Sequence, residues 1–363
     1  MNYFQRYLAE EFAEDYQEGR ISRRKAIKLI ASVTGSVVVA NSILAACAPA
    51  PSGEGTPMGV TPAGETPAGV SPTSAQTAIP NTGSQATGTA AIGTPTTGAT
   101  AMATSTTAAE TASPSPEASQ TMGATGTPES SSSTTGTPAA YGTVSPGDPS
   151  VTASEVQFPG RDGATLLGYQ AHPQQGSGPF AVVLVCHENR GLTEHIRDVT
   201  RRFAKAGYAA LAVDLLSRSG GTGKLSADDV PGALGNAAPD QFVNDFLSGW
   251  EYMQGQSFAQ AERVGMIGFC FGGGVTWRMA TKMPELQAAV PYYGPHPPLR
   301  EVPNIQAAVL GIYGGQDARI TGGVPEIEAA MKENNKVFEK VIYPNADHAF
   351  NNDTGQRYNA EAA

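Results

Sequence analysis

The stretch VGMIGFCFGGGV, residues 264–275, decides the fold of this chain. Its first half is apolar, as expected for a buried strand, and its second half is a cluster of glycines. Cys270 stands between the halves, with a glycine two positions before it and glycines two, three and four positions after it. The pattern predicts a strand, a tight turn with a thiol at its tip, and then a helix.

A thiol in this setting could be core filler, a redox sensor, a metal ligand or a nucleophile. The segment G-x-C-x-G at 268–272 has the form of the nucleophile elbow of α/β-hydrolases, with cysteine in place of the usual serine. At a helix start the dipole favours the thiolate of Cys270, and the backbone N–H of Phe271 can stabilise an oxyanion. The setting favours a nucleophile over the buried small hydrophobe that a lone cysteine most often is.

Strands and helices alternate on both sides of this turn. Apolar runs predict the strands, and helical spacing of apolar residues predicts the helices between them. The alternation indicates an α/β fold with a mostly parallel sheet flanked by helices. The expected strands are 166–171, 180–186, 208–213, 263–268, 286–291, 307–313 and 337–343, and the expected helices are 193–206, 240–254, 271–282 and 324–334, with a long loop at 217–239.

Two further residues complete a candidate catalytic set. In α/β-hydrolases the order along the chain is nucleophile, acid, histidine, and Asp317 and His348 follow Cys270 in that order, each after a predicted strand. Asp347 adjoins His348, but neighbouring side chains on an extended backbone diverge, so Asp317 is the better partner for the imidazole. A lone aspartate before a helix is most often a cap, but the ordered set predicts a Cys-His-Asp triad.

These motifs resemble the dienelactone hydrolase family across residues 155–363. The stretches that carry the resemblance are VVLVCHENRGL, YAALAVDLL, VGMIGFCFGGG, IYGGQDARI and YPNADHAFNN. The resemblance implies a single α/β-hydrolase domain with Cys270 as nucleophile and Asp317 and His348 as acid and base. It also implies an enzyme that cleaves an ester or lactone bond, as a carboxymethylenebutenolidase does.

The resemblance assigns roles in the loop after the strand at 180–186. Glu188 matches a glutamate that, in the family, contacts the resting thiol and helps to control its ionisation. Asn189 would supply a second oxyanion N–H beside that of Phe271. A solvated loop carboxylate is the alternative interpretation of Glu188.

The substrate is less well specified by the resemblance. Family members that act on dienelactone hold its carboxylate with arginines, one of them at the position that is Asn352 here. Arg190 and Arg218 could substitute, although each could equally be a surface arginine. Two other functions stay open, namely an acyl transferase and a non-catalytic, membrane-tethered binding protein on the same fold.

Other features of the sequence limit which partners and cofactors we expect the protein to bind. The net charge is −10 without a basic stripe, so nucleic acid is not an expected partner. Cys186 lies inside an apolar strand and is interpreted as core filler. No Cys/His spacing indicates a metal site, and we expect no cofactor. The expected partner is a small ester or lactone, and a monomer is the expected oligomeric state.

Residues 1–47 have the pattern of an export leader. The pair Arg23-Arg24 precedes a moderately apolar run at 29–46, which resembles a twin-arginine signal, and the ending LAAC at 44–47 resembles a lipobox. In such signals the peptidase cuts before the cysteine, and the thiol, here Cys47, carries lipid. A transmembrane anchor is the alternative. Both interpretations place an exported domain at a membrane.

The middle of the chain differs in composition from both ends. Residues 48–150 contain no Lys or Arg and consist mostly of Thr, Ser, Ala, Gly and Pro. Such a segment buries too little apolar surface to fold, so we expect a long disordered linker before the hydrolase-like domain at 151–363. Residues 359–363 resemble the opening of a helix, and the last helix of the domain is expected to be incomplete.

Overall fold

The computed structural model of this protein describes residues 1–46 and 142–363. Cys47 and nearly all of the predicted linker therefore lie outside the described residues. The two described ranges fall within one compact unit of the chain.

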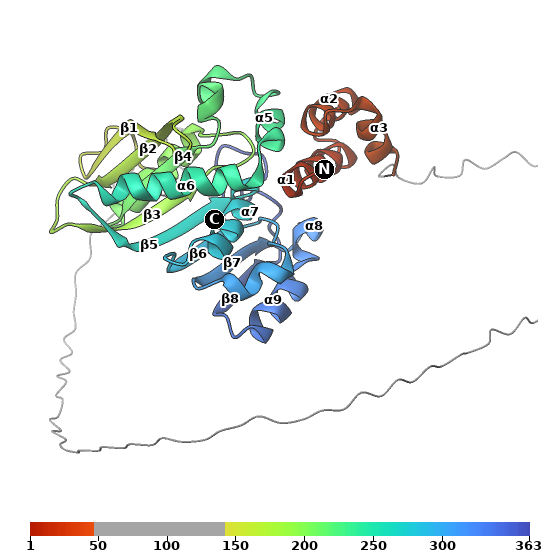
Figure 1. The fold of residues 1–363 in the computed structure, drawn as a ribbon. Helices are drawn as coiled ribbons and strands as arrows, with labels where there is room; N and C mark the ends of the chain where they lie inside the picture. The colour runs from red at the N-terminus through yellow and green to blue at the C-terminus, as the bar shows by residue number, and fades with distance from the viewer. Residues whose placement is uncertain (47–141) are drawn as a thin grey trace, which may run out of the picture. The chain divides into compact units, whose positions relative to one another are not determined.

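A mixed sheet of eight strands forms the centre of the range 142–363 (Figure 1). Its strand order is β1-β2-β4-β3-β5-β6-β7-β8. The pairs β1–β2 and β2–β4 are antiparallel and the remaining pairs are parallel, which confirms the predicted mostly parallel sheet. The strands are β1 (Val151–Pro159), β2 (Thr165–Pro173), β3 (Phe180–Cys186), β4 (Ala209–Asp214), β5 (Ala259–Phe269), β6 (Ala288–Tyr292), β7 (Ala308–Gly314) and β8 (Phe338–Tyr343).

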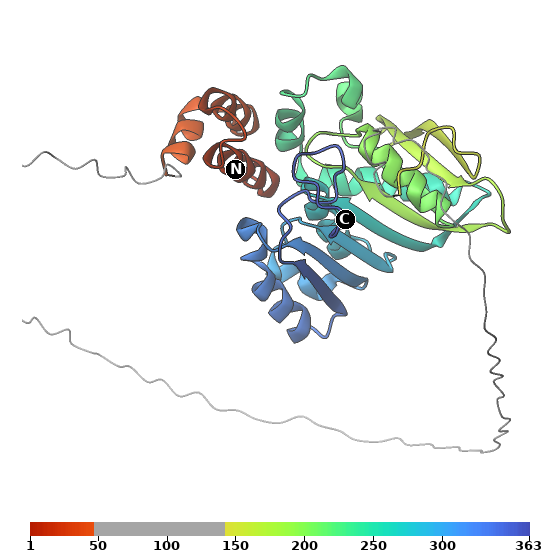
Figure 2. The same ribbon diagram turned by 180° about the vertical axis from the view of Figure 1, so that it is seen from behind.

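Helices cover both faces of this sheet. The chain passes from β3 through α4 to β4 in one direction, and from β5 through α7 to β6 in the other. Because such crossovers are right-handed, α4 lies on the face opposite to α6 and α7, as Figures 1 and 2 show. The helices are α4 (Glu194–Lys205), α5 (Val230–Asn236), α6 (Pro239–Gln254), α7 (Phe271–Lys282), α8 (Ala318–Thr321) and α9 (Val324–Glu333), with short 3₁₀ turns at Ser217–Ser219, Thr222–Lys224 and Leu299–Asn304.

The central and edge strands differ in burial as their sequences suggest. Every residue of β4 is buried, which explains its continuous apolar sequence between two helical layers. The edge strand β8 leaves Val341 and Ile342 about two-fifths exposed, at 37% and 40%. Residues 359–363, expected to open a helix, form a turn in which the N–H groups of Ala362 and Ala363 donate to the Asn359 carbonyl at 3.1 and 3.0 Å.

Two predicted boundaries change in the structure. The loop expected at 217–239 contains α5, whose start is marked by a proline in the first turn. Residues 142–150, assigned above to the linker, belong to the folded part. Their Val144 is buried, donates its N–H to Asp198 at 2.6 Å and accepts from Arg201 at 2.6 Å.

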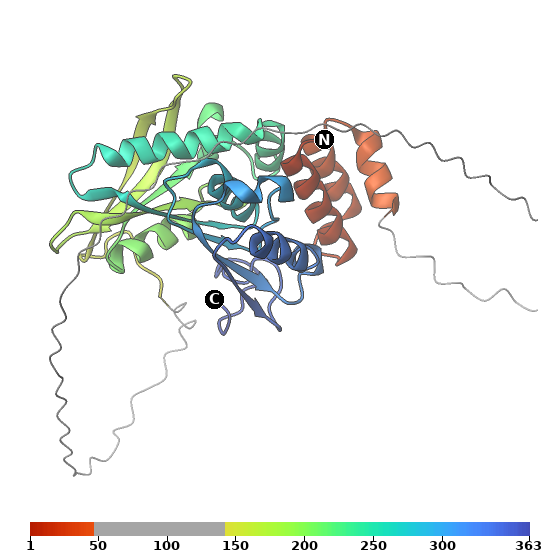
Figure 3. The same ribbon diagram turned by 60° about the horizontal axis from the view of Figure 1, so that its bottom comes forward.

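Three helices form at the N-terminus, namely α1 (Tyr3–Gln17), α2 (Arg23–Thr34) and α3 (Val37–Ala46), and they pack against one another (Figure 3). Asn2 and Gln5 form a capping box that starts α1. The apolar run at 29–46 is divided because Gly35 ends α2 with a φ of 72°. None of the helices in the described ranges has both the length and the apolar character required to span a membrane.

Candidate active site

The predicted nucleophile elbow is present between β5 and α7. Cys270 has φ 58° and ψ −120°, a conformation that non-glycine residues rarely adopt. A Cβ on Gly272 would lie 2.5 Å from the His187 carbonyl oxygen and 2.6 Å from that of Cys186. The glycine therefore lets the start of α7 approach β3, and the approach places the thiol at the carboxyl end of the sheet.

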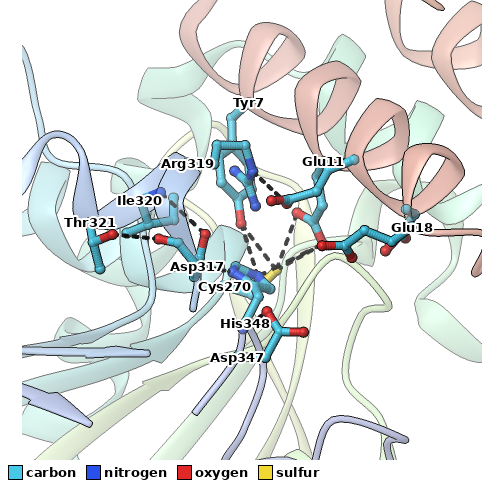
Figure 4. A network of polar contacts seen from close by, with 12 residues as sticks. Tyr7, Glu11, Glu18, Cys270, Asp317, Arg319, Ile320, Thr321, Asp347 and His348 are labelled. Carbon is cyan, nitrogen blue, oxygen red and sulfur yellow. Dashed lines mark hydrogen bonds and ion pairs between the residues drawn. The ribbon is translucent and has the colours of Figure 1, made fainter. Parts of the chain in front are cut away.

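The structure brings the three predicted triad residues together (Figure 4). Asp317 follows β7, and one of its carboxylate oxygens accepts from His348 Nδ1 at 2.6 Å. The Cys270 Sγ and a ring nitrogen of His348 lie within 4.8 Å of one another. Asp317 also caps α8 by accepting the Ile320 N–H at 3.2 Å, so the same carboxylate serves as helix cap and as partner of His348.

Electrostatics support an ionic partnership between Asp317 and His348. Burial alone would lower the pKa of the His348 imidazole, but the facing Asp317 carboxylate and the Cys270 sulfur outweigh burial and hold that pKa well above its usual range. Burial likewise would raise the pKa of Asp317, and the His348 charge brings it below its usual value. The imidazole is therefore held in orientation and favours the protonated form.

The thiol is surrounded by groups that favour its protonated form. Burial, followed by the charge of the Glu11 carboxylate, raises the pKa of the Cys270 thiol, and His348 acts in the opposite direction. The side chain of Cys270 has almost no exposure, at 2%. In this arrangement Cys270 favours the thiol over the more reactive thiolate.

The residues expected to form the oxyanion hole, Phe271 and Asn189, lie at the start of α7 and in the loop after β3. Phe271 is the first residue of α7, so its N–H has no acceptor within the helix. Asn189 follows β3 in a buried position, and its side-chain amide donates to Glu11 at 2.8 Å.

Glu188 makes no hydrogen bond to the thiol within the described residues, but its charge contributes to raising the pKa of Cys270, as the resemblance implies. Its carboxylate accepts a hydrogen bond of 2.6 Å from Asn352 Nδ2, and its other oxygen has no hydrogen-bond partner within the described residues. Burial raises the pKa of Glu188. The carboxylate at hydrogen-bond distance from the thiol belongs to Glu11 instead. Asn352, at the position of a family arginine, is thus a partner of Glu188.

The two candidate substrate arginines differ in their surroundings. Arg218 lies in the first 3₁₀ turn after β4 and pairs with Asp162 and Asp245, both at 2.7 Å. Arg190 is exposed in the loop after β3, and its charge acts on the Glu188 carboxyl group. Within the described residues Arg190 has no hydrogen bond or ion pair, so of the two arginines it is the better candidate for contact with a substrate. Cys186 is fully buried in β3, as its interpretation as core filler requires.

Two residues of the site come from α1, which the sequence analysis assigned to an export leader. Figure 4 shows Tyr7 and Glu11 extending from this helix to the thiol. The Tyr7 hydroxyl lies 3.3 Å from Cys270 Sγ and 3.4 Å from His348 Nε2. Glu11 lies 3.5 Å from the same sulfur. The capping box and the apolar spacing at positions 4, 8 and 12 are the signals that could have revealed α1.

The cluster of Glu11, Cys270 and His348 also has donor atoms of the kinds that zinc takes. Hydrogen bonds account for the cluster without a metal, because Tyr7 bridges the sulfur and the imidazole and Asn189 holds the carboxylate. A thiol, an imidazole and an orienting carboxylate in this order can carry out nucleophilic acyl transfer.

Comparisons with known proteins indicate the family to which this chain belongs. A family model for the dienelactone hydrolase family matches residues 166–363. A protein of Methylorubrum extorquens provisionally named carboxymethylenebutenolidase is 35% identical over 238 residues, covering 62% of this chain and 81% of the relative. A relative of the same name in Escherichia coli K12 is 35% identical over 233 residues, covering 60% of this chain and 84% of the relative.

A solved structure supports the same assignment. The crystal structure of a Klebsiella pneumoniae protein, provisionally named a dienelactone hydrolase, matches with a TM-score of 0.55 and 33% identity. The match covers 59% of this chain and 93% of that chain. The family match and the fold agree, and the chain therefore belongs to the dienelactone hydrolase family.

Proposed function

We propose that this protein hydrolyses an ester or lactone bond through Cys270, His348 and Asp317, as a carboxymethylenebutenolidase-type enzyme without a cofactor. The observation that carries the proposal is the 2.6 Å bond from His348 to Asp317 beside an elbow cysteine. The family membership and the printed names of the relatives support the same reaction class.

The proposed reaction has two stages. His348 holds the proton of Cys270 as an imidazolium, and the Cys270 thiolate attacks the carbonyl carbon. The N–H groups of Phe271 and Asn189 stabilise the oxyanion. The carbon–oxygen bond breaks, and the leaving oxygen takes the proton from His348. His348 then removes a proton from water, which attacks the thioester and releases the acid, and Asp317 orients the imidazole throughout.

The substrate class follows from the polar groups around the site. Asn352 is engaged by Glu188 and carries no charge, so it does not replace an arginine that would hold a substrate carboxylate. Arg190 is the candidate for that role because its side chain is exposed near Glu188. We propose a small ester or lactone as substrate, with dienelactone as the first compound to assay.

Replacement of Cys270 tests the function. We expect Cys270→Ala in the full chain to reduce hydrolysis of p-nitrophenyl acetate and dienelactone by about 10³ or more, because the nucleophile is lost. Cys186→Ala is the matched control, since this second cysteine is buried in β3, and its rate should stay near that of wild type. A Cys270→Ala protein as fast as wild type would contradict the proposal.

We further propose that residues 1–47 direct export and that Cys47 is lipidated, which would anchor the enzyme at a membrane outside the cytoplasm. The arginine pair at 23–24 and the LAAC ending at 44–47 support this proposal.

A further inference from the structure

The helix α1 is anchored directly beside the elbow. Phe4 is fully buried, and its ring centroid lies 4.7 Å from that of Phe271 and 5.4 Å from that of Phe242. The Tyr3 hydroxyl donates to the Pro295 carbonyl at 2.7 Å. Since Phe271 is the residue after the nucleophile, the apolar face of α1 packs on the start of α7.

Ion pairs tie α1 and the turn after it to the loops that carry the triad. Arg319, two residues after Asp317, pairs with Glu14 at 3.0 Å, and its guanidinium lies 4.8 Å from the centre of the Tyr7 ring. Arg20 pairs with Asp347, the residue before His348, at 2.6 Å. These contacts therefore join α1 and the turn after it to the loops that carry Asp317 and His348.

The carboxyl group of Glu11 occupies the place that a substrate acyl group requires. One oxygen lies 3.5 Å from Cys270 Sγ, near the distance of about 3–3.5 Å at which reacting atoms meet. The other oxygen accepts from Asn189 Nδ2 at 2.8 Å and lies 3.9 Å from His348 Nε2. A planar group with two oxygens therefore stands where the nucleophile would meet an ester carbonyl.

The reacting groups are closed to solvent in this arrangement. Cys270 is 2% exposed, His348 1% and Glu11 3%. A cavity of about 310 Å³ in the structure is lined by residues such as Leu167, Asp214 and Thr222, and not by the triad. With α1 in place, the thiol therefore exposes too little surface to meet an ester.

We propose that α1 is an intramolecular inhibitor, with Glu11 occupying the acyl site, and that turnover requires α1 to leave the site. This proposal depends on the proposed function in one respect, the identification of the closed site as the site that binds a substrate acyl group. The covalent connection between residues 1–46 and the rest of the described structure runs through 47–141, and α1 contributes no strand to the sheet, so its release unpairs none.

Two substitutions in the full chain test the proposal by loosening α1 without touching the triad. Phe4→Asp places a charge in the apolar contact, and Glu14→Lys sets two cations against each other at Arg319. Arg6→Ala is the control, because Arg6 is 75% exposed and pairs with Glu10 on the same helix. Each protein is assayed for alkylation of Cys270 by iodoacetamide, followed by peptide mass, and for hydrolysis of p-nitrophenyl acetate.

We expect both loosening variants to increase alkylation and hydrolysis by about tenfold or more, as a larger open fraction requires, and Arg6→Ala to match wild type. If the two loosening variants are alkylated faster but neither they nor wild type hydrolyse the ester, the inhibitor proposal stands and the proposed hydrolase function is rejected. Glu14→Lys preserves the apolar core, so an alkylation rate equal to that of wild type in this variant would overturn the inhibitor proposal. Faster alkylation with slower hydrolysis than wild type would also overturn it, because α1 would then supply groups that the reaction needs.

Discussion

At the scale of single residues, Asp317 shows how one side chain can satisfy two interpretations. It caps α8 through one oxygen and holds His348 through the other. A helix cap alone would leave the second oxygen free, so the cap interpretation and the triad interpretation are compatible. The same geometry creates a buried ion pair, and its consequences for stability depend on pH.

The pH dependence of the Asp317–His348 pair can be predicted from the directions of its pKa shifts. His348 has a raised pKa in the folded protein, so its contribution is complete below its unfolded pKa of about 6.5 and is lost as pH rises through the folded value. Asp317 has a lowered pKa, so its contribution is present above an unfolded pKa of about 3.9 and is lost as pH falls through the folded value.

Urea unfolding across pH measures this effect. We expect the difference in unfolding free energy between wild type and His348→Gln to be largest between about pH 4 and pH 6.5 and to shrink on both sides. A difference that stays constant from about pH 6.5 to pH 10 would mean that the imidazole gains no proton affinity on folding.

At the scale of elements, the elbow depends on the contact between the start of α7 and the end of β3. We expect Gly272→Ala to lower the free energy of unfolding by about 1–3 kcal/mol and to slow hydrolysis, because the added Cβ would press on two backbone carbonyls that cannot rotate away. Urea unfolding and the ester assay check both effects.

The matched control for the elbow is Gly223→Ala in the second 3₁₀ turn, where a Cβ would meet nothing within 4 Å. Its stability should remain near that of wild type. Equal stability of the two alanine variants would show that α7 can shift to accommodate the methyl group, and that the elbow does not require close contact between α7 and β3.

The helix α1 lies in the segment that the sequence patterns predict to be an export leader, and the structure shows it packed against the domain. Its apolar positions face the hydrolase core, while the arginine pair and the apolar run that follow have the pattern of a leader. A packed helix and a leader are compatible within one segment. The structure adds to the leader interpretation a fold for residues 1–46 and a contact with the thiol.

At the scale of the whole molecule, the leader proposal makes a prediction about the mature protein. On expression in a bacterium that processes lipoproteins, we expect the mature protein to begin at Cys47, to carry lipid and to sediment with membranes. Peptide mass and fractionation measure this. Cys47→Ala should block processing, and a mature wild-type protein that retains residues 1–46 would contradict the leader.

Cleavage would also connect the two proposals. If the chain is cut before Cys47, α1 leaves with the leader and the thiol becomes accessible, so the inhibitor would act only on the precursor. Measuring iodoacetamide alkylation of Cys270 in precursor and mature forms compares the two states directly.

The sequence by itself determined the sheet, the elbow and the order of the triad, because these depend on local periodicity, turn chemistry and strand order. Tertiary structure alone decided which carboxylate meets the thiol. Tyr7 and Glu11 contact Cys270 at sequence separations of 263 and 259, and Glu188 contacts Asn352 at a separation of 164. Such distant pairings arise from how helices and loops pack, and no local pattern in the chain specifies them.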